Sequence, residues 1–200
     1  MMREKRKIRV SYNSPVILNF VMVSLIVLIA GYISGGAITR TLFMTYRSSL
    51  LNPLTFIRLF THVLGHSSWL HFIGNASYLL LLGPMLEEKY GSGMIIRIMA
   101  VTALATGIVN SIFSANTALC GASGVVFAFI VLASFTGFNS GEIPLTFILV
   151  AVIYIGQQLY EGLIVSDDIS NTAHIVGGIV GAVIGYAFNK REAEDEIDII

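Results

Sequence analysis

The residues of this chain that could do chemistry are one serine, two histidines and an asparagine: Ser123, His174, His71 and Asn75. A serine hydroxyl becomes a nucleophile when a nearby base takes its proton, and histidine is the usual base. The tetrahedral intermediate of acyl transfer then needs hydrogen-bond donors around its oxyanion. The side chains of His71 and Asn75 and the backbone N–H of Ser123 could supply them. These residue types therefore indicate acyl transfer.

Small residues flank the serine and would let a substrate backbone approach it: Gly121, Ala122 and Gly124. An acidic third member is not obvious. Asp167 and Asp168 precede the last apolar segment, but loop acids beside a membrane are usually just solvated. A Ser–His dyad is therefore expected rather than a triad.

The composition places this chemistry in a membrane. Apolar residues make up 55% of the 200 residues, and only 12% are charged, against about 25% in soluble domains. The first ten and the last eleven residues carry 13 of the 24 charged side chains. The charged side chains that remain for the rest of the chain are too few to form a water-soluble surface. The composition therefore predicts a polytopic, all-α membrane protein. The few basic residues make a nucleic-acid partner improbable.

Six apolar segments are long enough to cross a bilayer. They are residues 15–35, 69–86, 94–113, 121–138, 143–163 and 171–188. We expect a basic cytoplasmic N-terminus over residues 1–14, a six-helix domain over 15–188 and a charged cytoplasmic tail over 189–200. Five Lys/Arg in the first ten residues predict an N-in, C-in orientation by the positive-inside rule. The long connection between the first two segments is rich in leucine and phenylalanine, so we expect it to pack on the bundle or lie in the membrane interface.

This topology predicts where the polar residues meet. The second, fourth and sixth segments would all begin at the outer face. His71 and Asn75 share one face near the start of the second, Ser123 begins the fourth, and His174 begins the sixth. Polar residues at membrane depth mark function by default, so the convergence favours a site over separate packing roles.

Three motifs resemble those of the rhomboid intramembrane serine proteases. The segment from His62 to Asn75 is similar to the family's second-helix signature, residues 121–124 to its G-x-S-G motif, and residues 173–181 to its A-H-x-x-G-x-x-x-G motif. The resemblance covers essentially the whole chain in order and spacing.

The resemblance implies a role for each matched residue. Ser123 would be the nucleophile and His174 the general base. His71, Asn75 and the Ser123 amide would form the oxyanion hole, and His66 would lie above the site and help to hold water. Gln157 and Gln158 would lie on the helix that gates substrate entry, and Glu87 and Gly91 match a structural Glu-x-x-x-Gly pattern.

Two positions depart from the family pattern. Ile57-Arg58 stands where a Trp-Arg pair is common, and Phe127 stands where Tyr usually stacks on the catalytic histidine. A phenyl ring can still stack, so we expect Phe127 to support His174. Gly177, Gly181 and Gly185 recur every four residues, which predicts close packing of the last helix.

The resulting hypothesis is an endopeptidase that cleaves transmembrane proteins within the bilayer of a prokaryotic cell (inner) membrane, with its site towards the outer face. No metal or other cofactor is expected, and the oligomeric state is left open. A catalytically silent relative that only binds transmembrane helices stays an alternative. A small transporter is a weaker one, because the inner halves of the segments are apolar, for example residues 79–82 and 130–133.

Overall fold

The computed structural model describes residues 11–113, 117–135 and 171–197, together with residues 145, 148–149, 152–153 and 156. The elements in chain order are α1 (Pro15–Ile33), α2 (Ala37–Leu42), α3 (Pro53–Thr61), the 3-10 turn η1 (His62–Leu64), α4 (Trp69–Tyr90), α5 (Ser92–Phe113), α6 (Ser123–Ser134) and α8 (Asn171–Ile197). The predicted all-α fold is confirmed. Three of these helices, α1, α4 and α5, are long and apolar enough to cross a membrane.

The helix bounds differ from the predicted segments in two informative places. α4 continues past residue 86 to Tyr90, because Glu87 is used inside the protein rather than marking a polar end. α8 continues past residue 188 to Ile197, through a run of Lys, Arg and Glu that favours helix although it is charged. The predicted segment 143–163 lies almost entirely outside the described residues, and so do Gln157 and Gln158.

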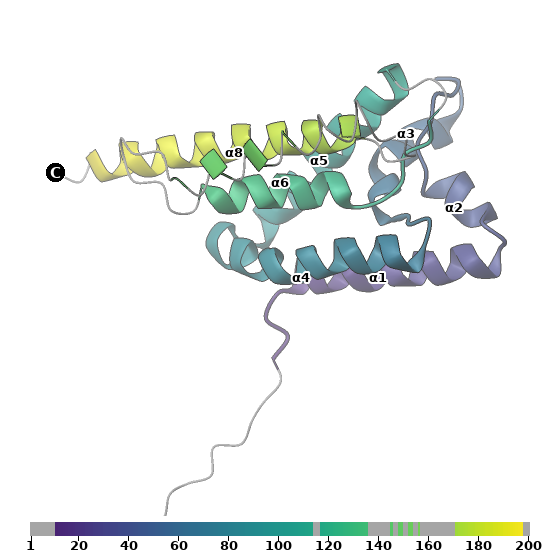
Figure 1. The fold of residues 1–200 in the computed structure, drawn as a ribbon, viewed down its shortest axis with the longest axis horizontal. Coiled ribbons are helices and arrows are strands. Elements are labelled where there is room, and N and C mark those ends of the chain that lie inside the picture. The colour runs from purple at the N-terminus through teal and green to yellow at the C-terminus, as the bar shows by residue number, and fades with distance from the viewer. Residues whose placement is uncertain are drawn as a thin grey trace, which may run out of the picture.

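The helices run in alternating directions, as Figure 1 shows. α4, α6 and α8 run from the end of the bundle where α2 and α3 lie towards the opposite end, while α1 runs the other way. The starts of α4, α6 and α8 therefore share one end of the bundle, hereafter the site end.

α6 and α8 pack backbone to backbone. A Cβ on Gly177 would overlap the carbonyl oxygen of Gly124 and lie 2.8 Å from its carbonyl carbon. A Cβ on Gly181 would overlap the carbonyl oxygen of Ala128 in the same way. Only glycine, whose side chain is a single hydrogen atom, lets the two helices approach this closely at these positions, as the glycine spacing predicts.

The core surrounds α6. Its apolar side chains Val125, Phe129 and Leu132 are fully buried against apolar residues of the neighbouring helices, among them Leu79 of α4 and Ile98 of α5. A helix that is buried over most of its surface has little freedom to shift. The residue at its start is therefore held in place by the core itself.

The connection between α1 and α4 packs on the bundle, as predicted. α3 lies against α5, where a Cβ on Gly107 would come within 3.2 Å of Leu59. The other side of this connection is apolar and exposed; its most exposed side chains are Leu50, Leu51, Phe56, Ile57 and Phe60. An apolar, outward-facing surface on a packed segment suits contact with lipid.

Candidate functional site

Ser123 is the first residue of α6, with Ala122 at the N-cap. The first backbone bond of the helix runs from the Val126 N–H to the Ala122 carbonyl. The N–H of Ser123 is therefore one of the donors that have no acceptor within their own helix. The Ser123 side chain is half-buried, so its hydroxyl is held by the protein while still reachable.

The backbone before Ser123 is fixed by the connection between α1 and α4. Thr45 and Leu119 form an isolated antiparallel bridge, with N–H to carbonyl distances of 2.9 and 2.8 Å. The Gly121 N–H donates to the His62 carbonyl at 2.9 Å. The segment that leads into α6 is therefore fastened at two points, which fixes where Ser123 lies.

Gly121 brings this segment against α4. Its φ of +122° favours glycine, and a Cβ there would lie 2.5 Å from His71 Nε2 and 3.5 Å from Asn75 Nδ2. The backbone two residues before Ser123 thus passes directly beside both side chains. The structure brings the His71–Asn75 face of α4 and the start of α6 together.

Asn75 carries a donor without a protein acceptor. The residue is 7% exposed, and its Nδ2 is buried with no hydrogen-bond partner in the described part of the chain. Buried polar groups are nearly always paired, so an orphan asks for an explanation such as a functional role. A donor without a partner at this position could bind an oxyanion.

The second ring nitrogen of His71 is held by a serine. Ser67 Oγ lies 3.2 Å from His71 Nδ1. When the Ser67 hydroxyl donates to Nδ1, the proton of the neutral ring lies on Nε2, the nitrogen that faces Gly121. In that tautomer, the ring presents a second donor to the same place as Asn75 Nδ2.

His174 lies beside the first turns of α6. Its ring centroid is 4.4 Å from that of Phe127, with the two planes tilted by 42°. Phe127 is one turn after Ser123 and on the same face of α6. The contact of Gly177 with Gly124 sets the level of α8 so that its first turn, with His174, is alongside the start of α6. The ring contact expected of Phe127 is therefore present.

His66 lines the other side of His71, with their ring centroids 5.0 Å apart. Its Nδ1 lies 3.2 Å from the Leu64 carbonyl, which can only accept, so Nδ1 carries the proton. Burial, with a smaller contribution from His71, lowers the pKa of His66 to about 4. The neutral ring has an acceptor, Nε2, without a partner among the described residues.

His62 is a second neutral histidine. It lies in the segment that resembles the second-helix signature, but the resemblance implies no role for it. It is 1% exposed, its Nδ1 is 3.1 Å from the Arg58 carbonyl, and its Nε2 is 3.3 Å from Thr106 Oγ1. Burial lowers the pKa of His62 to about 4. Because its carbonyl also accepts from Gly121, His62 links α5 to the segment before the serine.

Arg58 has an aromatic partner although Ile57 replaces the usual tryptophan. The guanidinium carbon lies 4.5 Å from the ring centroid of Tyr46, and Nε donates to the Leu54 carbonyl at 3.0 Å. The partner comes from twelve residues earlier in the same connection, so no local motif could reveal it. Tyr46 thus supplies the aromatic contact at a buried arginine.

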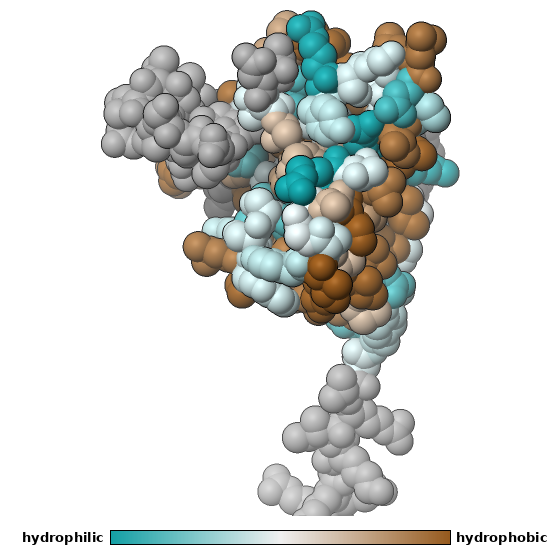
Figure 2. Space-filling view, turned by 90° about the vertical axis from the view of Figure 1, so that its right-hand side faces the viewer, coloured by the Kyte–Doolittle hydropathy of each residue, from teal (hydrophilic) through white to brown (hydrophobic). Residues whose placement is uncertain are grey.

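Polar side chains concentrate at the site end. Figure 2 looks on to that end and shows hydrophilic and intermediate residues gathered on the face, while hydrophobic residues cover much of one flank. Charged and polar groups belong at the bilayer surface and apolar ones in its core. A site at the starts of α4, α6 and α8 would therefore lie close to water.

The chain resembles known proteins. Residues 53–191 match the family model of the rhomboid domain. The rhomboid protease GlpG of Haemophilus influenzae is 29% identical over 136 residues, which are 66% of this chain and 70% of that protein. The rhomboid protease GlpG of Pectobacterium atrosepticum is 28% identical over 182 residues (88% of this chain, 64% of that protein). The rhomboid protease GlpG of an Enterobacter species is 34% identical over 137 residues (65% and 48%).

The similarity spans between 48% and 70% of the lengths of these three relatives. The matched region contains α4, α6 and all but the last six residues of α8, and with them Ser123, His174, His71 and Asn75. The family match covers well over half of the chain. The chain is therefore a member of the rhomboid family.

Proposed function

We propose that this chain is an intramembrane serine endopeptidase that cleaves peptide bonds in or near the transmembrane segments of other proteins. The observation that carries the proposal is the close approach of the Gly121 backbone to His71 Nε2 and Asn75 Nδ2. It provides donors next to the proposed nucleophile, in a chain whose relatives are named rhomboid proteases.

In the proposed first step, Ser123 Oγ attacks the scissile carbonyl carbon while His174 takes the hydroxyl proton. The carbonyl oxygen becomes an oxyanion, which would accept hydrogen bonds from Asn75 Nδ2, His71 Nε2 and the Ser123 N–H. His174 then gives its proton to the leaving amine as the peptide bond breaks. The products of this step are an amine and an ester on Ser123.

In the second step, His174 takes a proton from water, whose oxygen attacks the ester carbon. The same donors stabilise the second oxyanion, and its collapse returns the proton to Ser123 Oγ and releases the acid. Water would reach the ester from the polar site end, past His66. No step calls for a metal or other cofactor.

We further propose six membrane spans with both termini in the cytoplasm of a prokaryotic cell and the site towards the outer face of its (inner) membrane. A substrate segment must unwind locally before its peptide bonds are accessible, because a helix occupies its own carbonyls. Substrates with helix-breaking and small residues near the cut should therefore be preferred.

The test is cleavage of a single-span model substrate in liposomes by the wild type, Ser123→Ala and His174→Ala. Product from the wild type alone would support both assignments. Product from Ser123→Ala would overturn the proposed site. If no variant cuts, labelling with a fluorophosphonate decides: labelling that depends on Ser123 supports an active enzyme, and its absence supports the alternative of a silent relative that only binds helices.

A further inference from the structure

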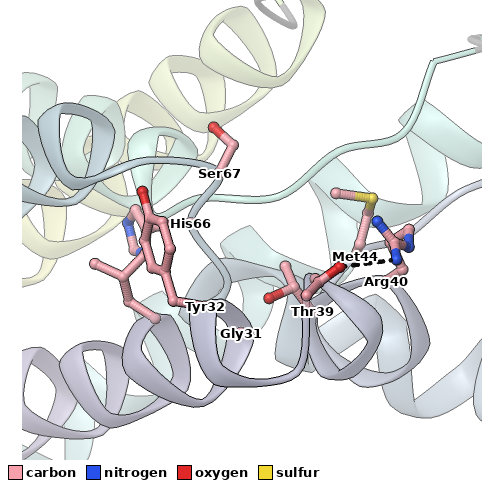
Figure 3. Close-up of a pocket in the computed structure, with 10 residues that line it drawn as sticks. Gly31, Tyr32, Thr39, Arg40, Met44, His66 and Ser67 are labelled. Atoms are coloured by element: carbon pink, nitrogen blue, oxygen red, sulfur yellow. Dashed lines mark hydrogen bonds between the residues drawn. The ribbon is translucent and has the colours of Figure 1, made fainter.

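A pocket of about 350 Å³ lies beside the candidate site, between the end of α1, α2 and residues 66–67. In Figure 3, Tyr32 and His66 lie on one side and Arg40 and Met44 on the other, with Thr39 between them. The mechanism above makes no use of this pocket, although His66 forms part of its wall.

The lining combines one cation with neutral polar groups. Of the ten described residues that line the pocket, none is acidic, and Arg40 is the one cation. Arg40 Nη2 donates to the Gly35 carbonyl at 3.1 Å, which holds the guanidinium over the turn between α1 and α2. Thr39 and Ser67 also line the space. This set suits an anion, because a guanidinium matches the geometry of a phosphate.

A buried acceptor in the wall is left without a partner. His66 is 3% exposed, and its Nε2 has no hydrogen-bond partner among the described residues. Because Nδ1 carries the proton, Nε2 can only accept, so its natural partner is a hydroxyl. A ligand with both a phosphate and a hydroxyl would satisfy Arg40 and His66 together.

The surroundings of the pocket indicate where such a ligand comes from. Tyr32 in the wall stacks on Trp69, with centroids 6.0 Å apart, and such aromatic pairs are typical of the headgroup level of a membrane. On either side of Tyr32, α1 presents exposed isoleucines, namely Ile26 (64%), Ile29 (41%) and Ile33 (82%). Acyl chains of a lipid seated in the pocket could lie along these side chains.

We propose that the pocket binds the phosphoglycerol head of an anionic phospholipid, with the phosphate on Arg40 and a glycerol hydroxyl donating to His66 Nε2. The volume is at the lower end of the range for ligand pockets, which suits a headgroup rather than a whole lipid. His66 contacts His71, so the bound head lies one side chain away from the candidate oxyanion residues.

The test is a titration of the purified full chain in detergent, with lipid binding followed by native mass spectrometry and by thermal stabilisation. The probes are dioleoylphosphatidylglycerol, dioleoylphosphatidylcholine and glycerol 3-phosphate. We expect the phosphatidylglycerol to bind roughly fivefold more tightly than the phosphatidylcholine, since one cation near the membrane surface supplies about that preference. Glycerol 3-phosphate should bind far more weakly, because it lacks acyl chains.

Two arginines of the same connection provide matched variants. Arg40→Gln should abolish the preference for phosphatidylglycerol, and Arg40→Lys should retain part of it. Arg47→Gln removes the same charge from an exposed residue outside the pocket and should change nothing. Met44→Trp, which fills the space, should block binding with the cation still present.

Equal losses in Arg40→Gln and Arg47→Gln would overturn the proposal in favour of general attraction between charges. Glycerol 3-phosphate binding as tightly as the lipid would overturn the lipid as the source of the ligand. The titration does not depend on proteolysis, and Ser123→Ala should bind lipid as the wild type does. A failure of this proposal is therefore distinguishable from a failure of the proposed enzyme.

Discussion

The two ends of α4 carry polar clusters of opposite character. Near its last turn, Glu87 accepts from the Ser14 and Ser92 hydroxyls at 2.5 and 2.7 Å and from the N–H groups of Val16 and Ile17 at 3.1 and 3.2 Å. Near its first turn, Asn75 Nδ2 is buried without a partner among the described residues, and so is His66 Nε2 just before the helix. The Glu87 carboxylate has its hydrogen bonds satisfied, whereas one nitrogen of Asn75 and one of His66 lack a partner among the described residues.

This difference in hydrogen bonding distinguishes a residue that stabilises the fold from residues with a proposed role in catalysis. Glu87 caps the free N–H groups at the start of α1 and fastens α1, α4 and α5 to one another, so all of its interactions are present in the free protein. An unpaired buried donor is unfavourable for folding and persists where a ligand or a transition state needs it. Substitutions in the two clusters should therefore have opposite effects: one should lower turnover and the other should lower the stability of the fold.

The largest expected effect is on catalysis at the unsatisfied cluster. Asn75→Ala removes one proposed oxyanion donor, so kcat should fall roughly 10²- to 10³-fold. The free energy of unfolding should change by less than about 1 kcal/mol, because no protein hydrogen bond is lost. Cleavage rates and denaturation of the same preparation measure the two quantities. A large loss of stability with normal turnover would reverse the assignment.

The satisfied cluster should behave in the opposite way. Glu87→Ala removes four hydrogen bonds to one carboxylate and leaves the start of α1 uncapped, which should destabilise the fold by about 3 kcal/mol. Turnover per folded molecule should stay close to that of the wild type. Glu87→Gln, which retains part of the hydrogen bonding, should lose less; if it lost as much or turnover collapsed, Glu87 would have a role beyond holding the helices.

Close backbone packing between α6 and α8 should also hold the site end together. Gly177→Ala would force a methyl group against the Gly124 backbone, which cannot move aside as a flexible side chain can. We expect a loss of about 2 kcal/mol, as for overpacking in general, and a drop in turnover as α8 moves away from α6. Gly74→Ala is the control, because its Cβ would meet nothing within 4 Å. Similar behaviour of the two variants would contradict the packing argument.

A smaller and graded effect should come from pH. The folded pKa of His66 is about 4, below the ordinary 6.5, so the unfolded chain binds more protons between these values. Stability should be fully present above pH 6.5 and fall as pH drops towards 4, by about 2 kcal/mol between pH 7 and pH 5 for this ring.

His62 has a similarly low pKa and should contribute a similar slope. His66→Gln should therefore remove one ring's contribution to the pH dependence of unfolding, and His62→Gln should do the same. Denaturation curves at pH 7, 6 and 5 measure the slopes. An unchanged slope in either variant would show that its ring titrates equally in the folded and unfolded chain.

Much of this protein could be predicted from the order of its residues. Apolar segments of spanning length, the four-residue spacing of His71 and Asn75, and glycines at every fourth position are local patterns with direct physical meaning. Counting segments is enough to place the starts of three helices at one end. The helix bounds were less predictable, because Glu87 looks like a polar end until its partners near residue 15 are known.

The sequence by itself determined the helical class, the membrane setting and the chemical types at the site, because each follows from local composition and periodicity. Only the tertiary structure decided which polar atoms are paired, because pairing depends on contacts between distant segments. Ser14 with Glu87, Tyr46 with Arg58 and Gly121 with His71 are such contacts. Within the part of the chain that the structure describes, the same packing leaves Asn75 Nδ2 and His66 Nε2 without a partner, one at the candidate site and the other in the wall of the neighbouring pocket.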